Sequence, residues 1–164
     1  TLEAGIVGMG GAAFPTHIKL AKNEKKPISD ILVNGCECEP YLTADHRLMI
    51  ESPQSVIAGS LMVQRATGAK RVSICIEDNK PKAILAIREA IGDRDIDIKV
   101  MKSKYPQGSE KALTVAALNR AVPTGGLPLD VGVVVVNVGT AASIARMVFA
   151  KRATPPGTAA RGRR

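Results

Sequence analysis

The chain has 164 residues, the length of about one domain, and 45% of them are hydrophobic, which is enough for a substantial core. With two Phe, two Tyr and no Trp, that core must be aliphatic, and the sequence lacks the aromatic platforms on which single-stranded nucleic acids stack. The formal net charge is +8, but five of the 23 basic residues follow Ala150, and the other 18 basic and 15 acidic residues leave the body at only +3, so we expect no nucleic-acid partner.

The alternation of apolar runs with amphipathic stretches predicts an α/β domain. In chain order, we expect a short helix at 18–21, a strand at 28–33, helices at 45–51 and 54–67, a strand at 71–76, a helix at 81–91, a strand at 96–101, a helix at 111–118, a strand at 131–136 and a helix at 140–149. This order indicates a three-layer domain in which a mostly parallel sheet, joined by right-handed crossovers, is flanked by helices.

The two ends of the chain and its cysteines give further expectations. We expect the domain to span 1–150, and the basic segment 151–164 to be a disordered tail, as consistent with a non-native addition as with a nucleic-acid arm. No stretch approaches the roughly 18–20 apolar residues of a spanning helix, so we expect no direct membrane insertion. Three Cys without a secretory signal indicate reduced thiols in a cytoplasm-like compartment.

A glycine-rich run near the start of the chain is the first candidate site. It reads Gly8-Met9-Gly10-Gly11-Ala12-Ala13 and fits the dinucleotide pattern G-x-G-x-x-A, in which glycines let the backbone approach a phosphate. The pattern normally follows a strand, and none is predicted before it, so a phosphate loop and a flexible turn both stay open. Lys19 is placed to reach an anion, or is simply solvated.

A second candidate lies at the carboxyl end of the first predicted strand, where ligands gather in open α/β sheets. It reads Asn34-Gly35-Cys36-Glu37-Cys38-Glu39-Pro40-Tyr41. Two thiols are too few ligands for zinc or an iron–sulfur cluster, so we favour reduced thiols over a metal site. Cys75, inside an apolar strand, is expected to be a core thiol.

Two more candidate loops also come after predicted strands, one around Tyr105 and one around Asn137 and Thr140. Tyr105 in a loop indicates either edge packing or ligand contact, and the Asn137 and Thr140 side chains suit a helix cap or a ligand. Because most of these loops follow predicted strands, the four candidates are expected to line one crevice at one edge of the sheet. Neither His17 nor His46 has a Ser or Cys at a spacing that would indicate a nucleophile–histidine pair, so a hydrolytic catalytic triad has little support.

Five segments now carry a resemblance to a known family. They read GIVGMGGAAFPT (5–16), NGCECEPYLTAD (34–45), EDNKP (77–81), KYPQG (104–108) and NVGTA (137–141). In order and spacing they resemble the C subunit of the Rnf electron-transport complex, from about residue 5 to about residue 148. More distantly, the chain is similar to the flavin-binding subunit of respiratory complex I and to subunits of cobalamin-reductase and proline-reductase systems.

The resemblance implies a Rossmann-like domain that binds FMN and NAD(H) in one crevice. It implies that the flavin and nucleotide site is lined by Gly8, Gly10, Gly11 and Lys19, and that Asn34 and Glu37 contact the flavin. Glu39 would approach the nicotinamide as the residue nearest the chemistry, and the ring system would be covered by Tyr105, Gly108 and Glu110. Asn137 and Thr140 would hold the ribityl-phosphate end, and Phe14 would stack on the adenine. No residue is expected to bind a metal. Iron–sulfur clusters are expected only in a C-terminal region that this sequence lacks.

The implied function is an NADH-linked oxidoreductase subunit that passes hydride between NADH and FMN and exchanges electrons with iron–sulfur clusters. The implied partners are NADH or NAD⁺ and the other subunits of a membrane-bound electron-transport complex, which places the chain in the cytoplasm, peripheral to the inner membrane. The chain departs from the complex I pattern at Met9, Ala13, Cys36 and Ser109. The alternatives are therefore an NAD-binding domain without flavin, a docking module with no activity alone, and a basic module that binds through its tail.

Overall fold

The computed structural model describes residues 5–9, 13–21, 26–37 and 42–153. Four strands form a single sheet in the spatial order β3-β2-β1-β4, and every neighbouring pair is parallel. The strands are β1 (Asp30–Gly35), β2 (Arg71–Glu77), β3 (Asp97–Met101) and β4 (Val133–Asn137). The predicted α/β class is confirmed, and the sheet is parallel throughout these strands.

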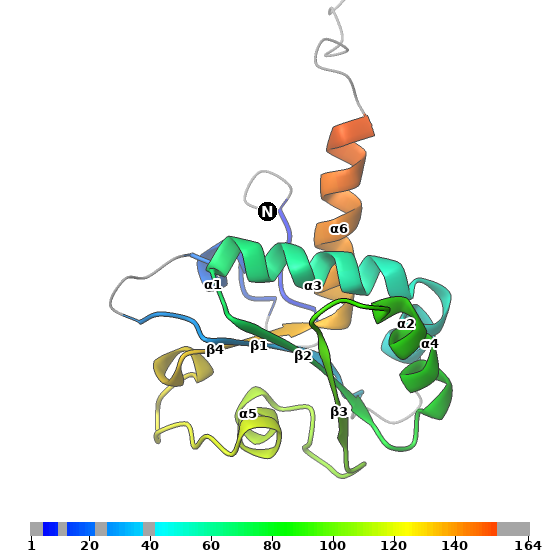
Figure 1. Ribbon diagram of the computed structural model, residues 1–164. Helices are drawn as coiled ribbons and strands as arrows, with labels where there is room; N and C mark the ends of the chain where they lie inside the picture. The colour runs from blue at the N-terminus through cyan, green and yellow to red at the C-terminus, as the bar shows by residue number, and fades with distance from the viewer. Residues whose placement is uncertain (1–4, 10–12, 22–25, 38–41, 154–164) are drawn as a thin grey trace, which may run out of the picture.

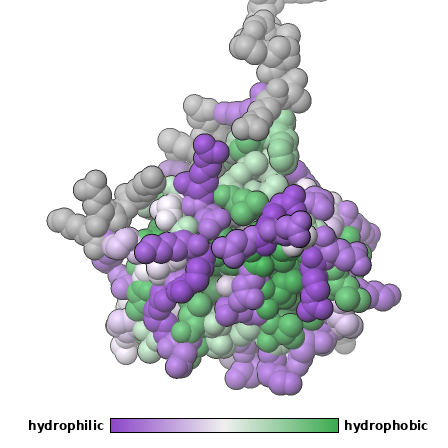
Figure 2. All heavy atoms as spheres, viewed as in Figure 1, coloured by the Kyte–Doolittle hydropathy of each residue, from purple (hydrophilic) through white to green (hydrophobic). Residues whose placement is uncertain are grey.

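Helices lie on both faces of this sheet (Figure 1). In chain order, they are α1 (Thr16–Lys19), α2 (Ala44–Glu51), α3 (Pro53–Thr67), α4 (Pro81–Ile91), α5 (Glu110–Leu118), the 3-10 helix η1 (Pro128–Val131) and α6 (Val138–Ala153). Figure 1 shows α2, α3, α4 and α6 on one face and α5 on the other. The far end of α6 rises beyond the body, where apolar atoms stay in view (Figure 2) and Phe149 is half exposed.

Alternate residues along each strand fill two separate cores, one for each face. Ile31 and Val33 of β1 pack in the larger core, with buried residues of α3 and α6. Leu32, between them, packs in the smaller core with Leu113 of α5. Since neighbouring side chains of a strand point to opposite faces, a strand that is buried on both sides reads as one continuous apolar run.

Helices α3 and α6 pack very closely at Gly59. A Cβ added there would lie 1.8 Å from the carbonyl oxygen of Ala141, so no larger residue fits without moving a backbone. Ala141 lies in the first turn of α6, directly after the end of β4. The close approach therefore fixes the start of α6 relative to the sheet.

Several boundaries differ from those expected. Strand β1 begins at Asp30 rather than at residue 28. Strand β4 begins at Val133 rather than at residue 131, because residues 128–131 form η1. Helix α6 begins at Val138 rather than Thr140, with no loop after β4, and it continues through Ala153 into the segment expected to be a tail; residues 154–164 lie outside the described part. Among the described residues, no helix has both the length and the apolar character needed to cross a bilayer.

Candidate functional site

The candidate site is a cavity at the edge where the parallel strands end, here called the carboxyl-edge cavity. It is lined by Gly8, Met9, Phe14, Thr16, Lys19, Asn34, Gly108, Glu110, Val135, Val136, Asn137 and Thr140. The strands place Asn34 and Asn137 side by side, since these residues are register partners at the ends of β1 and β4. Residues from all four candidate segments thus meet at one edge, as the sequence predicted.

The described residues on either side of the glycine run contact each other and the start of α6. The two sides are joined by a bridge between Val7 and Pro15 and by the 2.8 Å hydrogen bond from the N–H of Gly8 to the carbonyl of Phe14. The N–H of Met9 donates to the hydroxyl of Thr140 at 2.9 Å. Thr140 therefore ties the glycine segment to α6. The predicted site residues Gly10 and Gly11 lie outside the described residues.

Asn34 connects the end of β1 to the loop before α5. Its Nδ2 donates to the carbonyl of Gly108 at 2.9 Å, and its Oδ1 accepts from the N–H of Cys36 at 3.0 Å. Because both the nitrogen and the oxygen of its carboxamide make hydrogen bonds, the Asn34 side chain is held in one position. The part of the cavity wall formed by Asn34 and Gly108 is therefore in place before a ligand binds.

Lys19 and Glu110 meet at the cavity from opposite sides. The ammonium of Lys19, at the end of α1, lies 2.5 Å from Oε1 of Glu110, at the start of α5. The two side chains are 28% and 43% exposed, so water screens this pair and its contribution to stability is small. The cavity measures about 90 Å³, whereas sites for small-molecule ligands usually measure roughly 300–1,000 Å³. A ligand of nucleotide size would therefore extend beyond this cavity or displace part of its wall.

Glu37 and Tyr105, both predicted to contact the flavin, do not line the cavity. The Glu37 carboxylate accepts from the backbone N–H groups of Asp45 and His46, at 3.0 and 3.4 Å, and so satisfies the start of α2. The side chain of Tyr105 is 85% exposed. Glu39, the predicted residue nearest the nicotinamide, lies outside the described residues.

Asn137 meets the expectation of a helix cap. Its Oδ1 accepts from the N–H of Gly139 at 2.7 Å, in the first turn of α6. Its Nδ2 donates to Oδ2 of Asp45 at 2.6 Å. Burial raises the pKa of Asp45, the hydrogen bond from Asn137 lowers it, the nearby Glu37 charge raises it, and the net result lies above the ordinary value.

Sequence reasoning missed several parts of this site. Thr16, Val135 and Val136 line the cavity, and the Thr16 hydroxyl is buried with no hydrogen-bond partner among the described residues. Asp45 reaches the site through Asn137. Its signal in the sequence was an acidic residue in the first turn of a predicted helix that follows a strand's carboxyl end.

The thiols are buried rather than arranged for ligation. Cys36 and Cys75 are both buried, and burial raises the pKa of Cys75 to about 12. Within the described residues, no three His, Cys, Asp or Glu side chains come together as a metal site. Cys38 lies outside those residues.

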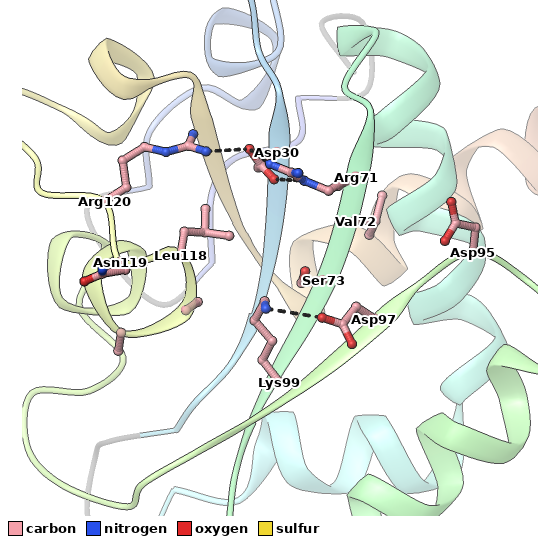
Figure 3. A pocket seen from close by; sticks show the side chains of 12 residues that line it. Asp30, Arg71, Val72, Ser73, Asp95, Asp97, Lys99, Leu118, Asn119 and Arg120 are labelled. Atoms are coloured by element: carbon pink, nitrogen blue, oxygen red, sulfur yellow. Dashed lines mark hydrogen bonds and ion pairs between the residues drawn. The ribbon is translucent and has the colours of Figure 1, made fainter.

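A larger cavity of about 560 Å³ opens at the opposite, amino edge of the sheet (Figure 3). Its central feature is Asp30, only 3% exposed, which accepts from Arg71 at 2.7 Å and from Arg120 at 3.1 Å. Burial raises the pKa of Asp30, but the hydrogen bonds from Arg71, Ser29 and Arg120 outweigh it and bring the pKa to about 2.

The charges of this amino-edge cavity are largely compensated within the protein. Lys99 lies 3.2 Å from Asp97, and Asp30 joins β1 to β2 and to the segment after α5 through its two arginines (Figure 3). These contacts stabilise the sheet. Because ligands of open parallel sheets bind at the carboxyl ends of the strands, we assign function to the smaller cavity.

The chain is similar to known proteins in sequence and in fold. Residues 2–146 match the family model described as the Nuo51 FMN-binding domain. The chain is 51% identical over 149 residues to the C subunit of the Na⁺-translocating ferredoxin:NAD⁺ oxidoreductase complex of Acetobacterium woodii, covering 90% of this chain and 34% of that protein. It is 49% identical over 146 residues to the proton-translocating counterpart of Clostridium ljungdahlii, covering 89% and 32%.

A solved structure shares the fold. The crystal structure of an NAD⁺-reducing [NiFe]-hydrogenase in the air-oxidized state superposes with a TM-score of 0.69 at 25% identity, over 90% of this chain and 29% of that one. The relatives confirm the resemblance to C subunits of ion-translocating electron-transport complexes. The chain spans about a third of the length of the two curated relatives.

Proposed function

Because the chain belongs to the family of Nuo51 FMN-binding domains, we propose that it binds FMN and NAD(H) at the carboxyl-edge cavity. The observation that carries the proposal is the convergence of Lys19, Asn34 and Asn137 at the edge where parallel sheets bind ligands. As a domain of an NADH-linked oxidoreductase, it would act within a larger protein, since its relatives are about three times as long.

The chemical groups that line the cavity are suited to binding flavin mononucleotide. Gly8 and Gly108 expose backbone to the cavity, and the Lys19 ammonium supplies a positive charge suited to a phosphate. The buried, unpartnered hydroxyl of Thr16 is a polar group that a ligand can satisfy. We assign Lys19 to an anionic group and the two glycines to close backbone approach.

The remaining roles follow the family. We propose that Asn34 and Glu37 contact the flavin, that Tyr105, Gly108 and Glu110 cover its rings, and that Asn137 and Thr140 hold its ribityl-phosphate end. Gly10 and Gly11 are assigned to the lining of the flavin and nucleotide site. Glu37 and Tyr105 do not line the carboxyl-edge cavity, so their contacts would be with a part of the flavin that extends beyond it. Phe14, half exposed at the cavity, offers its ring to an adenine, and Glu39 is assigned to the nicotinamide.

FMN, when bound, supplies hydride exchange with NADH and single-electron exchange with iron–sulfur clusters. The protein contributes position and charge. Lys19 holds the anionic end, Asn34 and Asn137 present fixed amide groups, and Val135 and Val136 form an apolar wall that excludes water. We propose that the iron–sulfur clusters and the other subunits of a membrane-bound complex lie outside this chain, which associates with the cytoplasmic side of the membrane through those partners.

The test is a visible absorption spectrum of the purified chain, recorded without oxygen before and after addition of FMN and then NADH. We expect a retained flavin band that bleaches on addition of NADH. Lys19→Gln should weaken FMN binding about tenfold, the loss of one charge-assisted contact. Lys82→Gln is the matched control, because Lys82 lies exposed on α4.

The other outcomes separate the alternatives. NADH binding without any uptake of FMN would replace the proposal with an NAD-binding domain that uses no flavin. A chain that takes up neither compound would be a docking module of its complex, and the proposed activity would be rejected for this chain.

A further inference from the structure

The carboxamide of Asn137 is held at both ends. Its Nδ2 lies 2.6 Å from Oδ2 of Asp45, and its Oδ1 lies 2.7 Å from the N–H of Gly139. A half-turn of the amide would place its oxygen against the Asp45 carboxylate and its NH₂ against the N–H of Gly139. Both of those contacts are repulsive, so only one orientation is stable.

We propose that Asp45 is a positioning residue that fixes the Asn137 carboxamide in this orientation at the wall of the carboxyl-edge cavity. An amide group has two donors and two acceptor lone pairs. One of each is used by Asp45 and Gly139, which leaves one N–H and one lone pair for a ligand. A ligand therefore meets a donor and an acceptor in fixed places.

The structure brings Asp45 to this position through Glu37. The Glu37 carboxylate accepts from the N–H groups of Asp45 and His46, which anchors the first turn of α2. Glu37 belongs to the segment directly after β1, and Asn137 ends β4, the neighbouring strand. The chain of contacts from β1 through α2 to β4 therefore ties Asn137 to the same edge as Asn34.

The lack of a side chain at Gly139 makes room for this arrangement. A Cβ at that position would lie 2.9 Å from both Oδ1 of Asn137 and the sulfur of Met9, and 3.8 Å from Oδ1 of Asp45. Any side chain there would push against the amide that Asp45 holds.

The charges that face Asp45 come from two other segments. Glu37 precedes α2 and raises the pKa of Asp45, whereas Lys80, before α4, lowers it. Lys80 is itself paired with the buried Glu77 at 2.5 Å, which limits its free charge. With burial as the largest influence, Asp45 takes up a proton at a higher pH than an ordinary aspartate. Protonation removes the charge that attracts the Asn137 NH₂.

The first arm of the test needs no ligand. In ¹⁵N-labelled protein, the side-chain NH₂ resonances of Asn137 should shift with pH at a midpoint above the ordinary range of aspartate. That titration should vanish in Asp45→Ala and persist in Asp93→Asn, a change at an exposed turn after α4. Resonances that do not titrate, or that titrate equally in Asp45→Ala, would overturn the proposal.

The second arm measures FMN affinity and rests on the proposed function. Asp45→Ala and Asn137→Ala should each weaken FMN binding roughly tenfold, and the double variant should bind no worse than Asn137→Ala alone. The native chain should lose affinity as the pH falls through the Asp45 titration, and Asp45→Ala should lack this step. Additive effects would mean that Asp45 acts independently of Asn137, against the proposal. If the native chain takes up no FMN, the proposed function fails, and the ligand-free titration alone decides the role of Asp45.

Discussion

Lys19 and Glu110, 91 positions apart in the chain, form an ion pair across the carboxyl-edge cavity with 2.5 Å between Nζ and Oε1. The pair joins α1 to α5, two elements on different sides of the cavity. Its partial exposure makes it weak, so it is suited to opening when a ligand enters.

The two members of this pair should have opposite effects on the binding of a phosphate-bearing ligand. Lys19→Gln removes the positive charge and should weaken FMN binding, whereas Glu110→Gln frees the charge of Lys19 and should strengthen binding a few-fold. Both variants should change the free energy of unfolding by less than about 1 kcal/mol. FMN titrations at low and moderate salt measure the effect, and a loss of affinity in both variants would show that the pair serves only to hold α1 against α5.

Asp30 should make the stability of the fold depend on acid pH. Its folded pKa of about 2 lies below the ordinary 3.8, so its stabilising effect is complete above the ordinary value and is lost as the pH falls through 3.8 toward 2. The loss should amount to about 2 kcal/mol in the free energy of unfolding. Urea unfolding at a series of pH values measures it.

Asp30→Asn is the informative variant for that experiment, because it removes the titrating group while keeping the shape of the side chain. It should flatten the acid dependence between the two pKa values and lower stability at neutral pH, since Arg71 and Arg120 lose their partner. Asp93→Asn, at an exposed position, should leave the profile unchanged. An unaltered acid profile in Asp30→Asn would assign the acid dependence to other carboxylates.

Cys75 should resist alkylation in the folded protein. It is fully buried, and burial raises the pKa of its thiol to about 12, so both access and thiolate are lacking near neutral pH. Iodoacetamide treatment followed by mass spectrometry of the Cys75 peptide should detect modification only after unfolding in urea. Rapid labelling of Cys75 under native conditions would require that β2 opens readily.

Gly59→Ala should destabilise the protein even though alanine favours helices. The added methyl would lie 1.8 Å from the carbonyl oxygen of Ala141, so α3 and α6 would have to move apart. We expect a loss of about 3 kcal/mol by thermal or urea unfolding. Arg65→Ala, on the exposed side of α3, should have a much smaller effect. A more stable Gly59→Ala would contradict the close packing of the two helices.

The sequence predicted helix boundaries best where residues with strong conformational preferences mark the start or the end of a helix. Helix α4 begins and ends where expected, because Pro81 suits a first helical turn and Gly92 follows the last. The meeting of the candidate loops at one edge was also predictable, since parallel strands with helical crossovers bring all their carboxyl ends together.

Contacts between residues far apart in the sequence could not be predicted from local patterns. The pairing of Lys19 with Glu110 depends on how α1 and α5 pack, which no local pattern encodes. No local pattern predicted that the Glu37 carboxylate would satisfy the start of α2. Helix α6 was expected to begin at Thr140, whereas Asn137 caps a helix that already includes Gly139.

The direct passage from β4 into α6 has a consequence for engineering the chain. Asn137 ends the strand and Val138 begins the helix, so no spacer separates them. One residue inserted there would rotate the rest of α6 by about 100° relative to the sheet and turn Thr140 away from Met9. A reporter peptide or fused domain therefore belongs at the loop around Gly125 and Gly126, which η1 and β4 separate from this junction, so that added length leaves the register of α6 intact.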